Sequence, residues 1–212
     1  MKQNRKDGRL ATVILQGLGA VFAVPILVLC IVRGAAEYGA AGVLAGLAFT
    51  LVMLVLFLAS MFHHIFSQDK IFLRKIDYCS VFLLFAAAYT PVALIALMRV
   101  DVATAWVLFG VVWLMAIVGT VLSLIDLKRF SNITMACFLG LCWCIILCLP
   151  NLMRVMPVIG VIMLFAGAVA FTLASMIANP EQEPKKGHHI LFHALTLGGA
   201  VCQGLMILLC VL

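Results

Sequence analysis

The chain has 212 residues, of which 66% are hydrophobic and only 10% carry a charge. A soluble globular domain is about half apolar and about one quarter charged, so this composition excludes a soluble protein and indicates a polytopic membrane protein. The net charge of +6 is explained by basic loops between membrane spans, and it therefore does not indicate binding to nucleic acid.

Seven apolar segments are separated by charged residues, proline and glycine. Each is long enough for a bilayer-spanning helix, which needs about 20 predominantly apolar residues. We therefore predict an all-α fold, a bundle of seven transmembrane helices that forms one domain over residues 1–212. The predicted spans, in chain order, are approximately 10–33, 39–66, 76–98, 102–125, 132–150, 156–178 and 188–212.

The first segment follows a basic start, as a secretory signal does. Its apolar run exceeds 20 residues, whereas the apolar region of a signal peptide has about 7–15 residues. Six further spans follow it. We therefore expect the first segment to be an uncleaved transmembrane helix.

The basic residues fall mainly on one side of the predicted bundle. Cytoplasmic loops retain lysine and arginine during insertion, so the side with more of them is the cytoplasmic one. If the N-terminus is cytoplasmic, only Arg33, Arg99 and Arg154 fall on the far side. The cytoplasmic segments then carry Lys2, Arg5, Lys6, Arg9, Lys70, Arg74, Lys75, Lys128, Arg129, Lys185 and Lys186. We expect a multi-pass protein of the inner membrane, with its C-terminus on the side opposite to the N-terminus.

All histidines of the chain lie in two short clusters at the ends of apolar segments. The clusters are His63-His64 and His188-His189 with His193. Ionisable side chains at membrane depth are costly, so such clusters indicate a functional site. In the predicted topology the second span ends, and the third and seventh begin, at the cytoplasmic side. This places His64, Asp77 and His189 at one membrane depth.

Helical spacing selects among these polar residues. Ser60 and His64 are four residues apart, as are His189 and His193, so each pair shares one helix face. The two other histidines lie about 100° away from those faces. Two histidines at i and i+4, joined by a third from a neighbouring helix, form a three-histidine set that leaves one coordination position for water. We therefore predict that His64, His189 and His193 bind a metal ion.

Zinc is the expected cofactor, because imidazole suits Zn²⁺ and catalytic zinc commonly has three protein ligands. Copper, iron and nickel also accept imidazole, so ligand type leaves them open. Asp77 is predicted to be either a fourth ligand or the group that hydrogen-bonds the bound water, and Ser60 could orient Asp77 or that water. A structural role for Asp77 also stays open, because the helix dipole favours a carboxylate at a helix start and Arg74 or Lys75 could pair with it.

Four motifs occur in order along the chain. They are Phe57-Leu58-Ala59-Ser60-Met61-Phe62-His63-His64, Leu73-Arg74-Lys75-Ile76-Asp77, Ala88-Tyr89-Thr90-Pro91 and His189-Ile190-Leu191-Phe192-His193. Together with the seven-span frame they resemble the hemolysin III family, which belongs with the adiponectin and progestin receptors and, more remotely, with the alkaline ceramidases. Two positions depart from the family pattern. The stretch around Gln16 lacks the acidic residue, asparagine and histidine that are common there, and Gln203 stands where a histidine is common.

The resemblance implies a buried zinc ion held by His64, His189 and His193, with Asp77 and Ser60 beside the metal-bound water. For eukaryotic relatives it implies lipid amide hydrolysis or hormone reception, and for bacterial members a cytolytic phenotype. We expect a zinc-dependent hydrolase of lipid amides or esters, in which Asp77 and Ser60 are catalytic. The alternative is a non-catalytic membrane sensor or permeability-modulating protein with a structural zinc ion. The expected partners are membrane lipids, and the sequence indicates neither nucleic acid nor a soluble partner and leaves the oligomeric state open.

Overall fold

All regular structure in the described part of the chain is helical, and that part contains no β-strand. The structure is a computed structural model that describes residues 2–66, 70–177 and 188–212, without the side chains of 2–9, 70–74, 78 and 189. The all-α prediction is therefore confirmed. The elements are α1 (Lys2–Phe66), α2 (Lys70–Pro91), the π-helix η1 (Val92–Ala96), the 3₁₀-helix η2 (Leu97–Arg99), α3 (Val102–Asp126), α4 (Ser131–Trp143), the 3₁₀-helix η3 (Cys144–Cys148), α5 (Leu149–Val155), α6 (Val158–Ile177), α7 (His188–Met206) and the π-helix η4 (Ile207–Val211).

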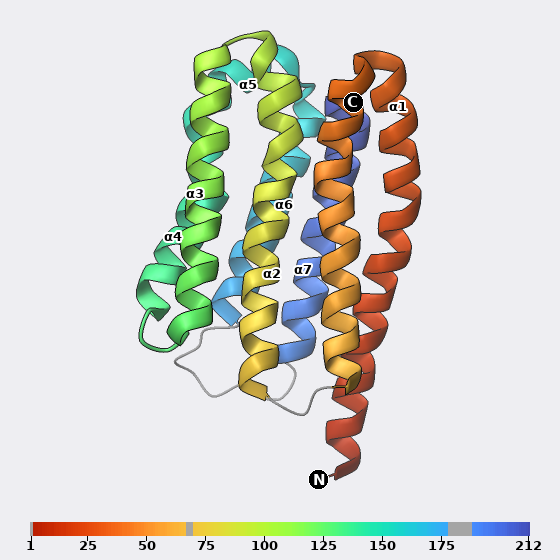
Figure 1. Cartoon of the computed structure of the whole chain (residues 1–212), viewed down its shortest axis with the longest axis vertical. Helices are drawn as coiled ribbons and strands as arrows, with labels where there is room; N and C mark the ends of the chain where they lie inside the picture. The colour runs from red at the N-terminus through yellow and green to blue at the C-terminus, as the bar shows by residue number, and fades with distance from the viewer. Residues whose placement is uncertain (1, 67–69, 178–187) are drawn as a thin grey trace.

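Element α1 consists of two arms that lie side by side and run in opposite directions (Figure 1). The chain turns at Gly39, whose φ of 58° and ψ of −140° are accessible mainly to glycine. Below the turn the backbones nearly touch, since a Cβ added to Gly34 would lie 2.6 Å from the carbonyl carbon of Gly42. Among the described residues, six helices are long and apolar enough to cross a membrane. Because the first of them contains two arms, the bundle has the seven apolar segments that the sequence predicts.

Helix α2 is the central helix of the bundle. Within the span Lys75–Arg99, 83% of an apolar stretch of 18 residues is buried inside the protein. The corresponding figure for the span formed by α3 is 28%. Aromatic side chains fill the space around it: the ring of Phe85 lies 5.0 Å from that of Phe171 on α6. The hydroxyl of Tyr89 donates a hydrogen bond of 2.9 Å to the carbonyl oxygen of Cys142 on α4. The buried position of α2 explains how one of its side chains can face both α1 and α7.

Polar side chains fix the two ends of α3. At its start, Asp101 accepts hydrogen bonds from the backbone N–H groups of Ala103 and Thr104, at 3.0 and 3.2 Å. The Thr104 hydroxyl and these N–H groups stabilise the carboxylate and hold the pKa of Asp101 below its usual value. At the other end, the ammonium group of Lys75 donates to the carbonyl oxygen of Leu124 at 2.7 Å. This contact fixes α2 against α3 next to Asp77.

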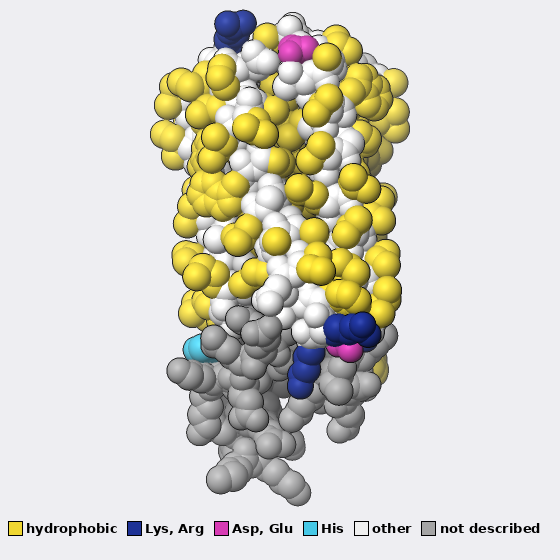
Figure 2. All heavy atoms as spheres, turned by 90° about the vertical axis from the view of Figure 1, so that its left-hand side faces the viewer, with side chains coloured by type: hydrophobic (Ala, Val, Ile, Leu, Met, Phe, Trp, Pro, Cys, Tyr) yellow, Lys and Arg dark blue, Asp and Glu magenta, His cyan; other side chains and the backbone are white. Residues whose placement is uncertain are grey.

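The lateral surface of the bundle is apolar. On α3, for example, Val107, Leu114 and Ile125 are 63–64% exposed. Figure 2 shows hydrophobic side chains over the middle of one face, and the charged side chains among the coloured residues lie near its two ends. An exposed apolar belt between charged ends is the surface that a lipid bilayer covers. The protein is therefore a multi-pass membrane protein.

Candidate metal centre

Four helical segments bring polar side chains together near one end of the bundle. The first arm of α1 contributes Gln16, and the end of its second arm contributes Ser60 and His64. Asp77 comes from α2 and His193 from α7. All five side chains are buried, with residue exposures between 2% and 7%. Buried polar groups are costly unless they are paired, so a buried polar cluster of this kind is a candidate functional site.

The carboxylate of Asp77 lies between the histidines and Ser60. Its Oδ1 accepts a hydrogen bond of 2.9 Å from the Ser60 hydroxyl. Its Oδ2 lies 3.4 Å from Nε2 of His64 and 3.6 Å from Nε2 of His193. The two imidazole rings are perpendicular, with their centroids 5.1 Å apart. The carboxylate thus has one oxygen held by Ser60 and the other directed at both imidazoles.

The donor set of this cluster fits a metal ion. One ligand atom each from His64, Asp77 and His193 all lie within 4.8 Å of one another. Two ligands at about 2.0–2.1 Å from a tetrahedral ion lie about 3.3–3.4 Å apart. The distances of 3.4 and 3.6 Å are close to that spacing, and they exceed the usual N–H···O hydrogen bond of about 2.7–3.2 Å. The group could therefore hold a metal ion, and its nitrogen and oxygen donors suit zinc as well as other first-row ions.

The remaining predicted ligand, His189, has its side chain outside the described residues. Its backbone lies in α7, one helical turn before His193. His63 and His188 are partly buried, and among the described side chains neither belongs to the His–Asp–His group. This agrees with the helical phase, which directs both of them away from the predicted ligand faces.

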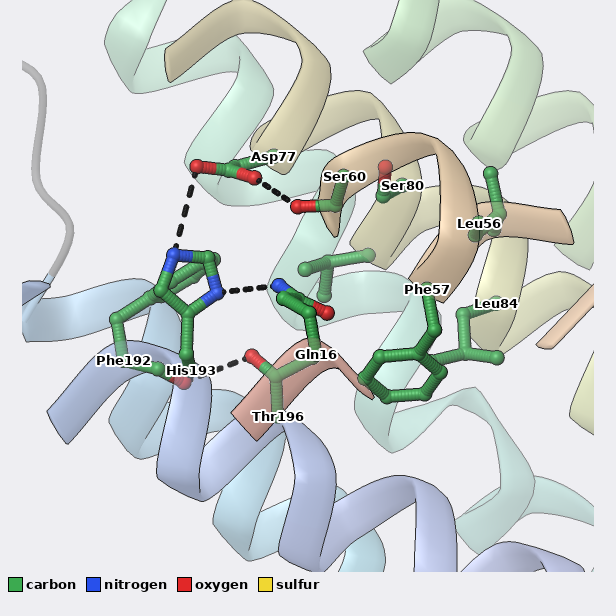
Figure 3. Close-up of a pocket in the computed structure, with 11 residues that line it drawn as sticks. Gln16, Leu56, Phe57, Ser60, Asp77, Ser80, Leu84, Phe192, His193 and Thr196 are labelled. Carbon is green, nitrogen blue, oxygen red and sulfur yellow. Dashed lines mark hydrogen bonds and ion pairs between the residues drawn. The ribbon is translucent and has the colours of Figure 1, made fainter. Parts of the chain in front are cut away.

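A small cavity adjoins Asp77 and His193 (Figure 3). Its volume of about 20 Å³ is enough for about one water molecule and far too small for an acyl chain. Apolar side chains such as Phe57 and Leu84 close part of the wall. The polar groups of the wall come from Gln16, Ser60, Asp77, Ser80, His193 and Thr196. A water molecule there would have several polar partners, as a buried water requires.

The contact between Gln16 and His193 was not anticipated from the sequence. The amide nitrogen of Gln16 lies 2.7 Å from Nδ1 of His193, whereas the sequence drew attention to Gln16 only as a departure from a family pattern. The available signal was a side-chain amide inside an apolar segment, since polar residues at membrane depth usually face the bundle interior. The partner on α7 could not be inferred from that signal.

The fold and the site define a class of protein: an all-helical, multi-pass membrane protein with a buried His–Asp–His group that could hold a metal ion. The family described as Haemolysin-III related matches residues 11–204, and the chain belongs to this family. The resemblance stated from the four motifs is thereby confirmed.

Curated relatives cover nearly the whole chain. "Hemolysin-3" of Bacillus cereus is 27% identical over 205 residues, which are 96% of this chain and 90% of the relative. "Hemolysin-3 homolog" of Bacillus subtilis (strain 168) is 28% identical over 197 residues, which are 92% of this chain and 90% of the relative. No solved structure gives a significant match.

Proposed function

We propose that this protein binds a zinc ion in the membrane and hydrolyses an amide or ester bond of a lipid. The observation that carries the proposal is a buried carboxylate, Asp77, directed at two imidazoles beside a cavity for one water molecule. His64 and His193, with His189 as the third predicted ligand, would hold the ion. A bound zinc ion supplies a water of lowered pKa, about 7, and polarises the carbonyl group that is attacked.

Asp77 is the candidate general base. It lines the water-sized cavity, so a water molecule there would be next to its side chain, as a general base requires. The Ser60 hydroxyl donates to Oδ1, so Oδ2, which faces the two imidazoles, is the oxygen that would receive a proton. A positioned general base typically contributes about 10²–10⁴-fold to a reaction rate. Ser60 acts through Asp77 and is a positioning residue in this mechanism.

A lipid is the proposed substrate because the site is buried inside a bundle whose exposed lateral surface is apolar. The cavity is large enough for about one water molecule and too small for an acyl chain. The reacting carbonyl group must therefore enter by a separation of helices near the end of the bundle. Lipid approach from the bilayer needs no aqueous channel, which suits a bundle whose exposed surface is apolar.

A non-catalytic role is the second candidate, and one observation favours it. The His–Asp–His group joins the second arm of α1, α2 and α7, so an ion bound there would tie three segments together. Metal binding then stabilises the fold and nothing more. A sensor or a permeability-modulating protein would fit this role, and the relatives carry the name hemolysin.

The two candidates are separated by one experiment on the purified native protein. We expect about one zinc ion per chain, and zinc-dependent release of a fatty acid or amine from a membrane lipid extract. Chelation should abolish the release, and added zinc should restore it. Thermal unfolding is followed in parallel. If a broad panel of amide and ester lipids yields no zinc-dependent product, while chelation strongly lowers the melting temperature, the structural role is correct and the hydrolase is wrong.

We also propose that the protein lies in the inner membrane with a cytoplasmic N-terminus and the C-terminus on the opposite side. The ends of the chain lie at opposite ends of the bundle in Figure 1, as seven crossings require. Lys75 contacts the end of α3 that leads to Lys128 and Arg129, so three basic residues share the end that carries the metal group. The other basic side chains assigned to that side lie outside the described side chains.

Reporter fusions test this orientation. A reporter that is active only in the cytoplasm is expected to work at the N-terminus and after Arg129, and to fail after Leu212. Activity after Leu212 would mean an even number of crossings and would overturn the proposed arrangement.

A further inference from the structure

Gln16 links the first arm of α1 to a histidine of the metal group on α7. Its amide nitrogen lies 2.7 Å from Nδ1 of His193, as the dashed line in Figure 3 marks. The two residues are only 4% and 2% exposed. A buried amide without hydrogen bonds is costly, so the contact holds both side chains in place.

The atom that Gln16 contacts decides which nitrogen of His193 can bind a metal ion. A neutral imidazole carries its proton on one nitrogen and offers a lone pair on the other. Nε2 of His193 faces Asp77 and is the candidate ligand atom. Binding through Nε2 therefore requires a proton on Nδ1 and a hydrogen-bond acceptor beside Nδ1.

In the structure the nitrogen of the Gln16 amide faces Nδ1. An amide nitrogen only donates, so with the amide in this orientation Nδ1 accepts and a neutral His193 carries its proton on Nε2. The carbonyl oxygen of the same amide would accept a hydrogen bond from Nδ1 once the amide turned over. A carboxylate at this position could only accept, whereas an amide can serve either tautomer.

We propose that Gln16 is a positioning residue that keeps the His193 ring in place in both tautomers: its amide donates to Nδ1 in the metal-free protein and accepts from Nδ1–H when Nε2 binds a metal ion. The second half rests on the proposed metal binding. On metal binding the Nε2 proton would pass to water and Nδ1 would take one proton from water, so the imidazole stays neutral and no net proton is gained or lost. The ring need not rotate when the ion binds, because the amide turns instead.

Three variants test this inference. Gln16→Glu provides an acceptor only and should fix the proton on Nδ1 even without metal. Gln16→Met keeps the length of the side chain and removes its hydrogen bonds. Gln203→Met is the matched control, because it also replaces a buried, hydrogen-bonded glutamine. Gln203 lies on α7, is 1% exposed, and donates to the carbonyl oxygen of Leu164 at 3.1 Å. It lies about 15 Å along α7 from His193.

The first readout is the tautomer of His193 in the metal-free protein, measured by ¹⁵N NMR with histidine labelling. The signals of His193 are assigned from their loss in His193→Ala. We expect an unprotonated Nδ1 in the native protein and in Gln203→Met, and a protonated Nδ1 in Gln16→Glu. The same tautomer in the native protein and in Gln16→Glu would overturn the inference.

The second readout is the affinity for zinc, measured by competition with a chelator. Removing a group that orients a metal-binding histidine typically weakens affinity by about 10–100-fold, which we expect for Gln16→Met. Gln16→Glu should bind zinc at least as tightly as the native protein, and Gln203→Met should bind it equally. If Gln16→Met binds zinc as tightly as the native protein, or if Gln203→Met loses as much zinc affinity as Gln16→Met, then Gln16 has a packing role only. If the native protein binds no zinc, the proposed function and the metal-dependent half of this inference both fail. The NMR readout then tests only the other half, that the Gln16 amide donates to Nδ1 of His193 in the metal-free protein.

Discussion

Replacing His193 with alanine is expected to reduce the zinc content from about one ion per chain to nearly none. His193 is 2% exposed and its ring centroid lies 5.1 Å from that of His64, so the substitution removes a buried imidazole from the group that could hold the ion. Loss of a ligand should cost more than the roughly 10–100-fold in affinity that follows from removing a group that only orients a ligand. Elemental analysis of protein dialysed against a weak chelator measures the effect.

His63→Ala provides the control for this experiment. His63 is the chain neighbour of His64, is partly buried, and does not belong to the His–Asp–His group among the described side chains. Its removal should leave the zinc content unchanged. His189→Ala tests the third predicted ligand and should resemble His193→Ala. Undiminished zinc in both His189→Ala and His193→Ala would remove the basis of the proposed function.

The number of membrane segments could be predicted because a span is set by length and hydrophobicity alone. Their ends were harder to place. The first span was expected to end at Arg33, but the helix continues to the turn at Gly39, because the intervening residues include Ala35 and Ala36, which favour helix. The fifth was expected to end at Pro150, yet α5 continues to Val155. Proline is tolerated there because it lies in the first turn of that helix, where its missing N–H is not needed.

Part of the candidate site could also be predicted. A four-residue spacing placed Ser60 with His64 on one helix face and His189 with His193 on another, and the alternation of spans placed His64, Asp77 and His189 at one depth. The structure brings Ser60, His64, Asp77 and His193 together, and Ser60 bonds to Asp77, which was one of the two partners expected for it. The contact of Gln16 with His193 depends on which helices are lateral neighbours in the bundle. Helical periodicity specifies the face of each helix and not its neighbour, so this contact required the structure.

Replacing Asp77 with asparagine is expected to lower turnover of the lipid substrate by about 10²–10⁴-fold and to retain most of the zinc. Asparagine keeps the shape of the side chain and an oxygen for the Ser60 hydroxyl, but it cannot take up a proton as a general base does. The three predicted histidine ligands are unchanged, so the metal should stay bound. Ser60→Ala should give a smaller loss, about tenfold, because it removes one hydrogen bond to a carboxylate that remains in place. Turnover and zinc content are measured on the same preparations.

Asp101→Asn provides the matched control for this last variant. Asp101 caps the start of α3, which is the opposite end of that helix from the one contacted by Lys75 near Asp77, and asparagine caps helices as well as aspartate does. The control should therefore keep both turnover and zinc. Because Oδ2 of Asp77 lies 3.4 Å from His64 and 3.6 Å from His193, the carboxylate is also close enough to share an ion with them. If Asp77→Asn loses zinc together with turnover, while Asp101→Asn loses neither, Asp77 is a metal ligand and its assignment as the general base is wrong.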